Sequence, residues 1–83
     1  MSSTFIPTAL RQRYQDFVAA KFGVAWLTRA DGETRTVVSD RLVLLRQHGG
    51  DTEVFCGDDG LLKLLQDDFA AELAAVLNQG EPT

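Results

Sequence analysis

The two side chains best suited to nucleophilic chemistry are the only histidine, His48, and the only cysteine, Cys56. A cysteine nucleophile needs a base within hydrogen-bond reach and a third group that orients the base. His48 lies beside a Gly-Gly turn and Cys56 ends the strand that follows, so a hairpin separates them by roughly 15–17 Å at 3.3–3.4 Å per residue. We therefore expect an exposed turn histidine, a buried cysteine and a chain that is not an enzyme.

Metal and phosphate chemistry have equally few candidate residues. Zinc sites take several Cys and His ligands, and the chain has one residue of each type. The acidic segment 51–59 does not follow the alternating oxygen ligands and closing Glu of a calcium loop. Residues 56–60 connect a predicted strand to a predicted helix, but they lack the lysine and the glycine spacing of a phosphate loop, and their two aspartates repel phosphate. The sequence predicts no bound metal ion and no cofactor.

Acidic side chains gather in the second half of the chain. Residues 1–48 carry seven Lys/Arg and four Asp/Glu, whereas residues 49–83 carry one Lys/Arg and eight Asp/Glu. Asp68 and Glu72 are a like-charged pair four residues apart in a predicted helix, which disfavours the helix slightly. Such charge is typical of a surface that contacts a partner, and equally of a solvated face. The candidate partner-binding residues of this segment are Asp58, Asp59, Asp67, Asp68 and Glu72.

An acidic helical face of this kind fits a protein partner with a basic groove, for example one that also binds nucleic acid. The chain itself has a net charge of −4. Modules that bind nucleic acid directly are usually basic. We therefore expect a protein partner and no direct contact with nucleic acid.

Trp26 is the sixth candidate partner-binding residue. A tryptophan near the end of a hairpin either fills the core or forms a contact hot spot, because its ring is large and its indole N–H needs an acceptor. Four residues separate Trp26 from the Asp31-Gly32 pair, which places it deep enough to reach the core. Both alternatives stay open from the sequence.

A helix is predicted over residues 8–21, ahead of the first predicted strand. Thr8 is the expected N-cap, and Gly23 is the expected C-terminal stop. Four apolar residues recur at the spacing that places them on one helix face. They are Leu10, Tyr14, Phe17 and Val18.

A β-hairpin is predicted next. The runs 24–29 and 34–38 flank Asp31-Gly32. Asp-Gly between β-prone runs favours a two-residue type I′ turn with positive φ at both central residues. This turn sets Thr28 opposite Arg35 and leaves apolar side chains on both faces. One face is therefore either covered by another element or used for binding.

Two further strands and a helix complete the predicted fold. Residues 41–46 and 52–56 are apolar runs joined by a Gly-rich turn. A C-terminal helix is predicted over 59–78, because apolar residues recur along it at helical spacing and the aspartates before it suit the start of a helix. A break at Asp67-Asp68, which would split this segment into two helices, is the alternative.

The chain 1–83 is predicted to be a single α+β domain with an N-terminal helix, a four-stranded antiparallel meander and a C-terminal helix, in the order αββββα. Residues 1–6 and 81–83 are expected to be loose ends. If both helices pack on one face of the sheet, the other face keeps exposed apolar side chains. A homodimer through that face would cover them.

The location of the protein is predicted from features that the sequence lacks. No apolar run approaches the roughly 20 residues of a membrane span. The N-terminus has no basic start followed by a long apolar core. The single cysteine cannot form an internal disulfide. We expect a cytoplasmic protein that does not contact membranes.

A non-enzymatic protein-binding module is the function that these observations favour. We expect a small inhibitor or adaptor that docks on a larger complex through the acidic helical face or an apolar sheet face. Phage or mobile-element anti-defence proteins have this size and character. The first alternative is a structural subunit of a homo- or hetero-oligomer, such as a phage assembly or toxin–antitoxin component. The second is a ligand-binding or catalytic domain whose site forms at a dimer interface.

Overall fold

The computed structural model describes residues 2–80 as an α+β fold with one five-stranded antiparallel sheet. The strands lie in the order β1-β5-β4-β3-β2. In chain order the elements are β1 (Ser2–Pro7), a 3-10 turn (Thr8–Leu10), α1 (Arg11–Phe22), β2 (Leu27–Thr28), β3 (Thr34–Val38), β4 (Arg41–His48), β5 (Asp51–Cys56) and α2 (Asp59–Gly80).

The predicted order αββββα with four strands is wrong, because the chain begins with a fifth strand. Residues 2–6, expected as a loose end, belong to β1, which pairs antiparallel with β5. In this register Thr4 lies opposite Val54 and Ile6 opposite Thr52. A pairing partner about 50 residues away leaves no local turn signal, so the sequence pattern did not reveal this strand. The other expected loose end, residues 81–83, lies outside the described residues.

The first hairpin also differs from its prediction. Arg29 N–H donates to the Glu33 carbonyl over 2.8 Å, and Gly32 N–H donates to the Arg29 carbonyl over 2.9 Å. The loop therefore has three residues, and within it only Gly32 has positive φ, at 88°. This loop shifts the register by one residue, so Thr28 pairs with Thr34 and not with Arg35.

The two-residue turn with positive φ at both central residues occurs one hairpin later. Ser39 has φ 51° and Asp40 has φ 65°, and the turn is closed by the Val38–Arg41 pair. This combination is that of a type I′ turn, the turn type that suits the twist of a hairpin. Neither residue is glycine, so the turn carries some left-handed strain.

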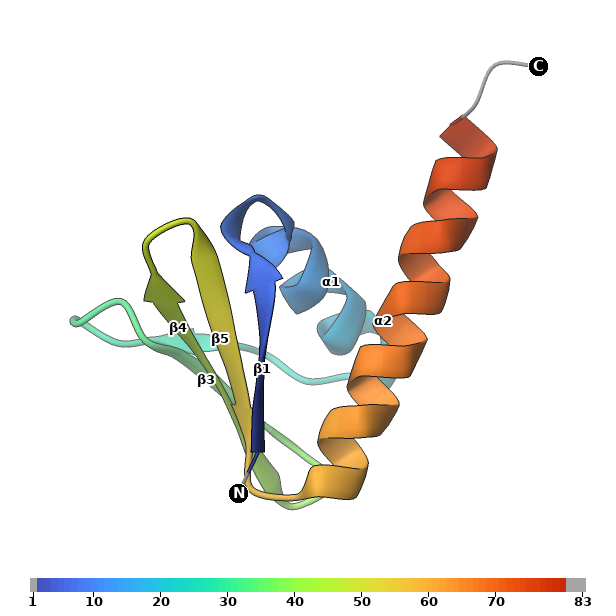
Figure 1. Ribbon diagram of the computed structural model, residues 1–83. Helices are drawn as coiled ribbons and strands as arrows, with labels where there is room; N and C mark the ends of the chain where they lie inside the picture. The colour runs from blue at the N-terminus through green and yellow to red at the C-terminus, as the bar shows by residue number, and fades with distance from the viewer. Residues whose placement is uncertain (1, 81–83) are drawn as a thin grey trace.

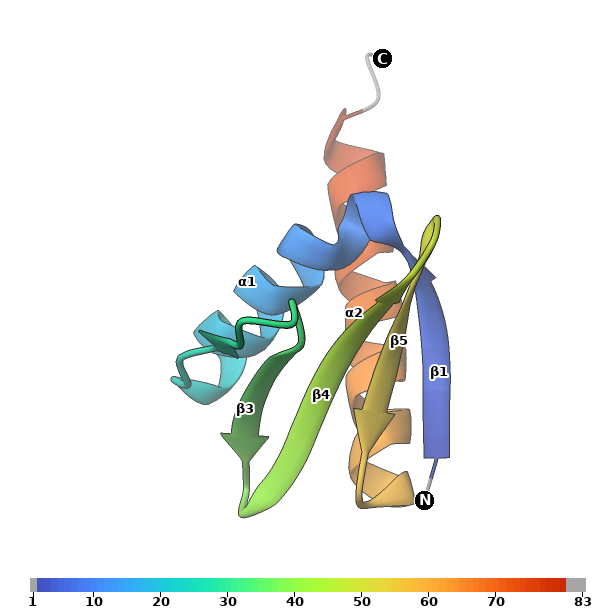
Figure 2. The ribbon, with the colours of Figure 1, turned by 90° about the vertical axis from the view of Figure 1, so that its left-hand side faces the viewer.

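Both helices pack on one face of the sheet, and within residues 2–80 no helix lies on the other face (Figures 1 and 2). The core lies between the sheet and the helices. Its ring contacts include Tyr14 of α1 against Phe69 of α2, edge to face with 4.9 Å between centroids. The buried core residues are Tyr14, Val18, Val38, Val43, Leu45, Val54, Cys56, Leu62, Leu65 and Phe69.

The helix ends follow the predicted signals in part. Gly23 ends α1 in the left-handed conformation and donates its N–H to the Ala19 carbonyl, as predicted. Thr8 does not cap a helix; its hydroxyl lies 3.2 Å from that of Thr52 and links the end of β1 to β5. The C-terminal helix is one continuous helix, and Asp58 caps it by accepting the Leu61 N–H over 3.0 Å.

The two turns give a matched test of the hairpin registers. Asp40→Gly should stabilise the protein by about 0.5–1 kcal/mol, because glycine adopts positive φ without strain. Asp31→Gly should destabilise it by about 1 kcal/mol, because the Asp31 carboxylate accepts the Glu33 N–H over 2.9 Å. Urea unfolding of the two variants measures both changes. If Asp40→Gly destabilised the protein and Asp31→Gly stabilised it, the result would support the two-residue turn at Asp31-Gly32 instead.

Candidate functional site

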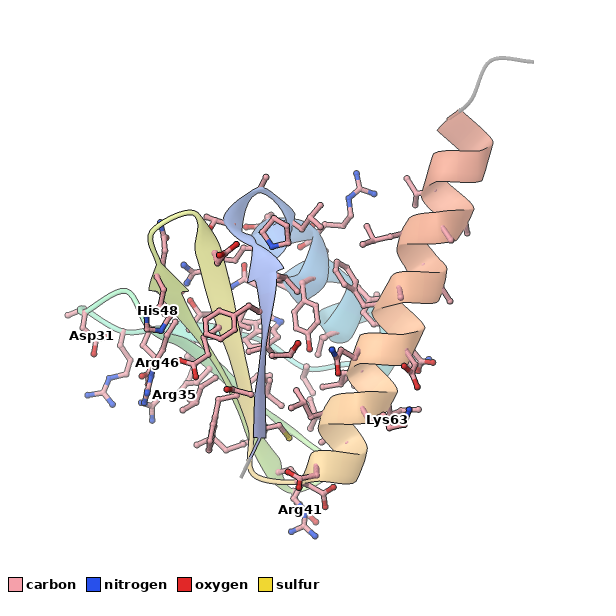
Figure 3. The ribbon with its side chains drawn as sticks, viewed as in Figure 1. Asp31, Arg35, Arg41, Arg46, His48 and Lys63 are labelled. Carbon is pink, nitrogen blue, oxygen red and sulfur yellow. The ribbon has the colours of Figure 1, made fainter. Side chains whose placement is uncertain are left out.

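The uncovered face of the sheet, here called the open face, carries exposed apolar and basic side chains next to one another. It is defined by strand alternation, which sends every second side chain away from the helices. In Figure 3, Arg35, Arg46 and His48 point to this side, opposite to the helices. The open face consists of Ser3, Phe5, Leu27, Arg35, Val37, Leu42, Leu44, Arg46, His48, Glu53 and Phe55.

The part of the open face over β2, β3 and the start of β4 is apolar. Leu27 is 69% exposed and Val37 is 55% exposed, and Leu42 lies directly opposite Val37. These side chains, with Val24, line a shallow hollow of about 350 Å³. Large apolar side chains that lie side by side in water are typical of a surface that binds another protein.

Leu44 lies in the middle of the open face and is 6% exposed, because its cross-strand neighbours Arg35 and Phe55 flank it. The Nε atom of Arg35 is buried there and makes no hydrogen bond within the described chain. Buried polar atoms are nearly always hydrogen-bonded in native proteins. The centre of the open face therefore has one donor for which the described part of the chain supplies no acceptor.

A row of ion pairs borders the apolar part of the open face. The Glu33 carboxylate accepts hydrogen bonds from Arg46 Nε over 2.7 Å and from Arg35 Nη2 over 2.6 Å. One strand further, His48 Nε2 lies 2.9 Å from Glu53 Oε1, and the His48 ring also packs edge to face on Phe5. These contacts link the start of β3 to β4, and β4 to β5 and β1, across the sheet.

In each pair the basic side chain is exposed and its carboxylate partner is largely covered. The Arg46 side chain is 53% exposed against 13% for Glu33, and His48 is 54% exposed against 21% for Glu53. Although the chain is acidic overall, the open face therefore combines apolar side chains with outward-facing basic groups. Electrostatic complementarity favours a partner that carries acidic groups around an apolar patch.

The carboxylates of the open face hold lowered pKa values. Hydrogen bonds from Arg46 and Arg35 lower the pKa of Glu33 below its ordinary 4.5. The hydrogen bond from His48 is the main cause that lowers the pKa of Glu53. Both carboxylates are therefore ionised at neutral pH, and the ion pairs of Glu33 with the two arginines weaken only in acid.

The acidic residues singled out in the sequence do not form one free surface. Asp58 caps α2 and lies 3.3 Å from Arg41 Nε, and both interactions lower its pKa, the cap more than the arginine. Asp67 pairs with Lys63 over 3.3 Å and Asp68 pairs with Lys21 over 2.8 Å.

The two remaining acidic candidates lie at different places along α2. Asp59 is in the first turn of the helix and also interacts with neighbouring groups. Glu72 lines the groove between α2 and α1, together with Arg13 and Lys21. The charge of this segment is thus partly compensated by basic residues of the same chain.

Trp26 lies in the loop before β2 and is packed against the core. Its indole N–H donates to the Gln15 carbonyl of α1 over 2.9 Å. The side chain therefore ties this loop to α1, and its hydrogen-bonding group is already used within the chain.

The residues considered for catalysis are on opposite sides of the sheet. Cys56 is fully buried beneath the helices, whereas His48 is on the open face beside Glu53. Within residues 2–80, no group of three or more His, Cys, Asp and Glu side chains is arranged to hold a metal ion. None of the described helices is both long and apolar enough to cross a membrane.

The ion-pair row was missed by sequence reasoning. The predicted register of the first hairpin was wrong by one residue and placed Thr28 opposite Arg35. The side chains of residues 24–29 were therefore assigned to the wrong faces of the sheet. Period-two alternation of Glu33, Arg35 and Val37 is the signal that was available for the face itself. No family model, curated protein or solved structure matches this chain.

The lowered pKa of Glu33 predicts a pH dependence of stability. Because the folded-state pKa lies below 4.5, the ionised carboxylate stabilises the fold above that pH, and this contribution is lost as pH falls through the lowered value. Glu33→Gln should therefore lower Tm at pH 7 and lose less Tm than the wild type between pH 5 and pH 3. Asp51→Asn, at an exposed carboxylate on the same sheet, is the control. Parallel acid profiles for wild type and Glu33→Gln would contradict the prediction.

Proposed function

We propose that this protein is a non-enzymatic protein-binding module, a small inhibitor or adaptor that docks on a larger partner through the open face. The observation that carries the proposal is the group of exposed apolar side chains, Leu27, Val37 and Leu42, on a sheet face that no described element covers. A face of this kind loses unfavourable contact with water when a partner covers it.

The basic groups beside this apolar patch favour a partner with acidic groups. Arg46 and His48 point their charged or chargeable ends outward, while their carboxylate partners are largely covered. A partner surface with carboxylates around an apolar centre complements this arrangement. The open face supports this kind of partner better than the acidic helix supports a basic groove, because Lys63, Lys21 and Arg41 already pair with that helix and its cap.

The support against an enzymatic role is the placement of the reactive groups. Cys56 has no access to solvent, and His48 is engaged with Glu53 on the other side of the sheet. General acid–base or nucleophilic catalysis needs such groups within hydrogen-bond reach of one another. We propose binding alone as the activity of this chain.

The test compares two surfaces in one binding experiment. The open-face variant is Leu27→Glu/Val37→Glu, at residues exposed enough to accept charge without disturbing the core. The control is Leu64→Glu, a leucine of α2 that is 47% exposed away from the open face. Wild type and both variants serve as bait in an extract of the source cells, and the partner captured is then titrated in purified form.

We expect the open-face variant to bind the partner at least about tenfold more weakly, because about 1.4 kcal/mol or more is lost at a central contact. Leu64→Glu should bind like the wild type. A third variant, Asp67→Asn/Asp68→Asn/Glu72→Gln, tests the acidic helix. Loss of binding in this variant alone would overturn the proposal and assign docking to the helix.

A further inference from the structure

β1 is the one edge of the sheet that is long enough to accept another strand. The sheet order places β1 at one edge and β2 at the other. β2 has two residues, whereas β1 has six. In Figure 2, β1 is the outermost strand on the right, and no ribbon flanks its outer side. Unpaired backbone groups on a strand of this length are a template for strand addition.

The register identifies which backbone groups of β1 face outward. Thr8 N–H donates to the Gly50 carbonyl over 2.9 Å. Because hydrogen-bonded pairs alternate along an antiparallel ladder, the even-numbered residues of β1 bond to β5. The hairpin between β4 and β5 leads to the same assignment. Its two-residue loop makes His48–Asp51 a hydrogen-bonded pair, so the backbone N–H and C=O groups of Thr52 and Val54 point toward β1. The outward groups are therefore those of Ser3, Phe5 and Pro7.

We propose that β1 pairs with β1 of a second copy of this chain, antiparallel and about a two-fold axis at Thr4. This register sets Ser3 opposite Phe5 of the second copy, and each such pair exchanges two backbone hydrogen bonds. A register centred on Phe5 would set Ser3 opposite Pro7, which has no N–H, and would leave the Ser3 carbonyl without a donor. The register centred on Thr4 satisfies the outward N–H and C=O groups of both residues.

The pairing closes after two copies. β1 is the longer edge strand of each chain, so a dimer through β1 leaves the two-residue β2 strands and the end of β3 that β2 does not pair with at its outer edges. An isologous contact of this kind forms a dimer and not a filament. Pro7 limits the paired segment at its other end, because proline cannot donate to a further ladder position.

The side chains along the seam suit the same contact. On the open face, Phe5 is 56% exposed and would lie diagonally across from Phe5 of the second copy. On the helix side, a groove of about 640 Å³ runs between β1 and α2, and Ile6, Leu62 and Phe69 are among its lining residues. The grooves of the two copies would meet across the seam and cover apolar surface in both.

The proposal goes beyond the docking function and does not depend on it. Dimerisation would join two open faces into one continuous ten-stranded surface, which doubles the area available to a partner. The two ideas fail separately, because the docking variants lie at Leu27 and Val37 on β2 and β3, at the opposite side of the sheet from β1.

The experiment is sedimentation velocity of the full chain at concentrations from about 1 μM to about 1 mM. We expect a species of twice the 9.1 kDa monomer mass at the higher concentrations. Phe5→Pro removes the outward N–H and should raise the dimer dissociation constant more than tenfold. Phe5→Ala keeps that N–H and should retain the dimer. Val37→Glu, on the open face away from the edge, should also retain it.

Amide hydrogen exchange gives a second measurement that needs no variant. The Ser3 and Phe5 amides should exchange at least tenfold more slowly in the dimer than in dilute protein, while exposed loop amides do not change. A wild-type protein that stays monomeric throughout would overturn the proposal. A dimer that Val37→Glu disrupts and Phe5→Pro leaves intact would overturn it as well, because the contact would then be between open faces.

Discussion

Both helices of this protein pack on the same side of a five-stranded sheet, and this constraint determines the character of every other surface. A sheet has two faces, and strand alternation supplies both with side chains. The helix-facing positions of β3, β4 and β5 are filled by Val38, Val43, Leu45, Val54 and Cys56. The same strands must present their other positions to water, and these are partly apolar. The open face follows from the fold and is not a local irregularity.

Local signals in the sequence predicted the helices better than the strands. The spacing of Tyr14 and Val18, the stop at Gly23 and a cap at one of the two aspartates before α2 each depend on a few neighbouring residues, and the structure has all three, with Asp58 as the cap. The pairing of β1 depends on a strand about 50 residues away. No periodicity within Ser2–Pro7 identifies that partner.

The turn chemistry shows why the hairpin register was mispredicted. Asp-Gly suits a two-residue loop, but it also suits the last two positions of a three-residue loop, where the glycine alone adopts positive φ. The Asp31 carboxylate bonds to the Glu33 N–H and favours the longer loop. One residue of difference moves every following side chain to the opposite face of the strand. For this reason the sequence predicted an apolar sheet face but did not predict the ion pairs of Arg46 and Glu53 beside it.

The fully buried Cys56 has a consequence for kinetic work on this chain. Its thiol lies at the end of β5 beneath both helices and is the only one in the sequence. A thiol reagent can modify it only when the helices separate from the sheet, because the reactive thiolate must reach solvent. The rate of alkylation in native buffer therefore reports how often the layers part, without any label introduced into the protein.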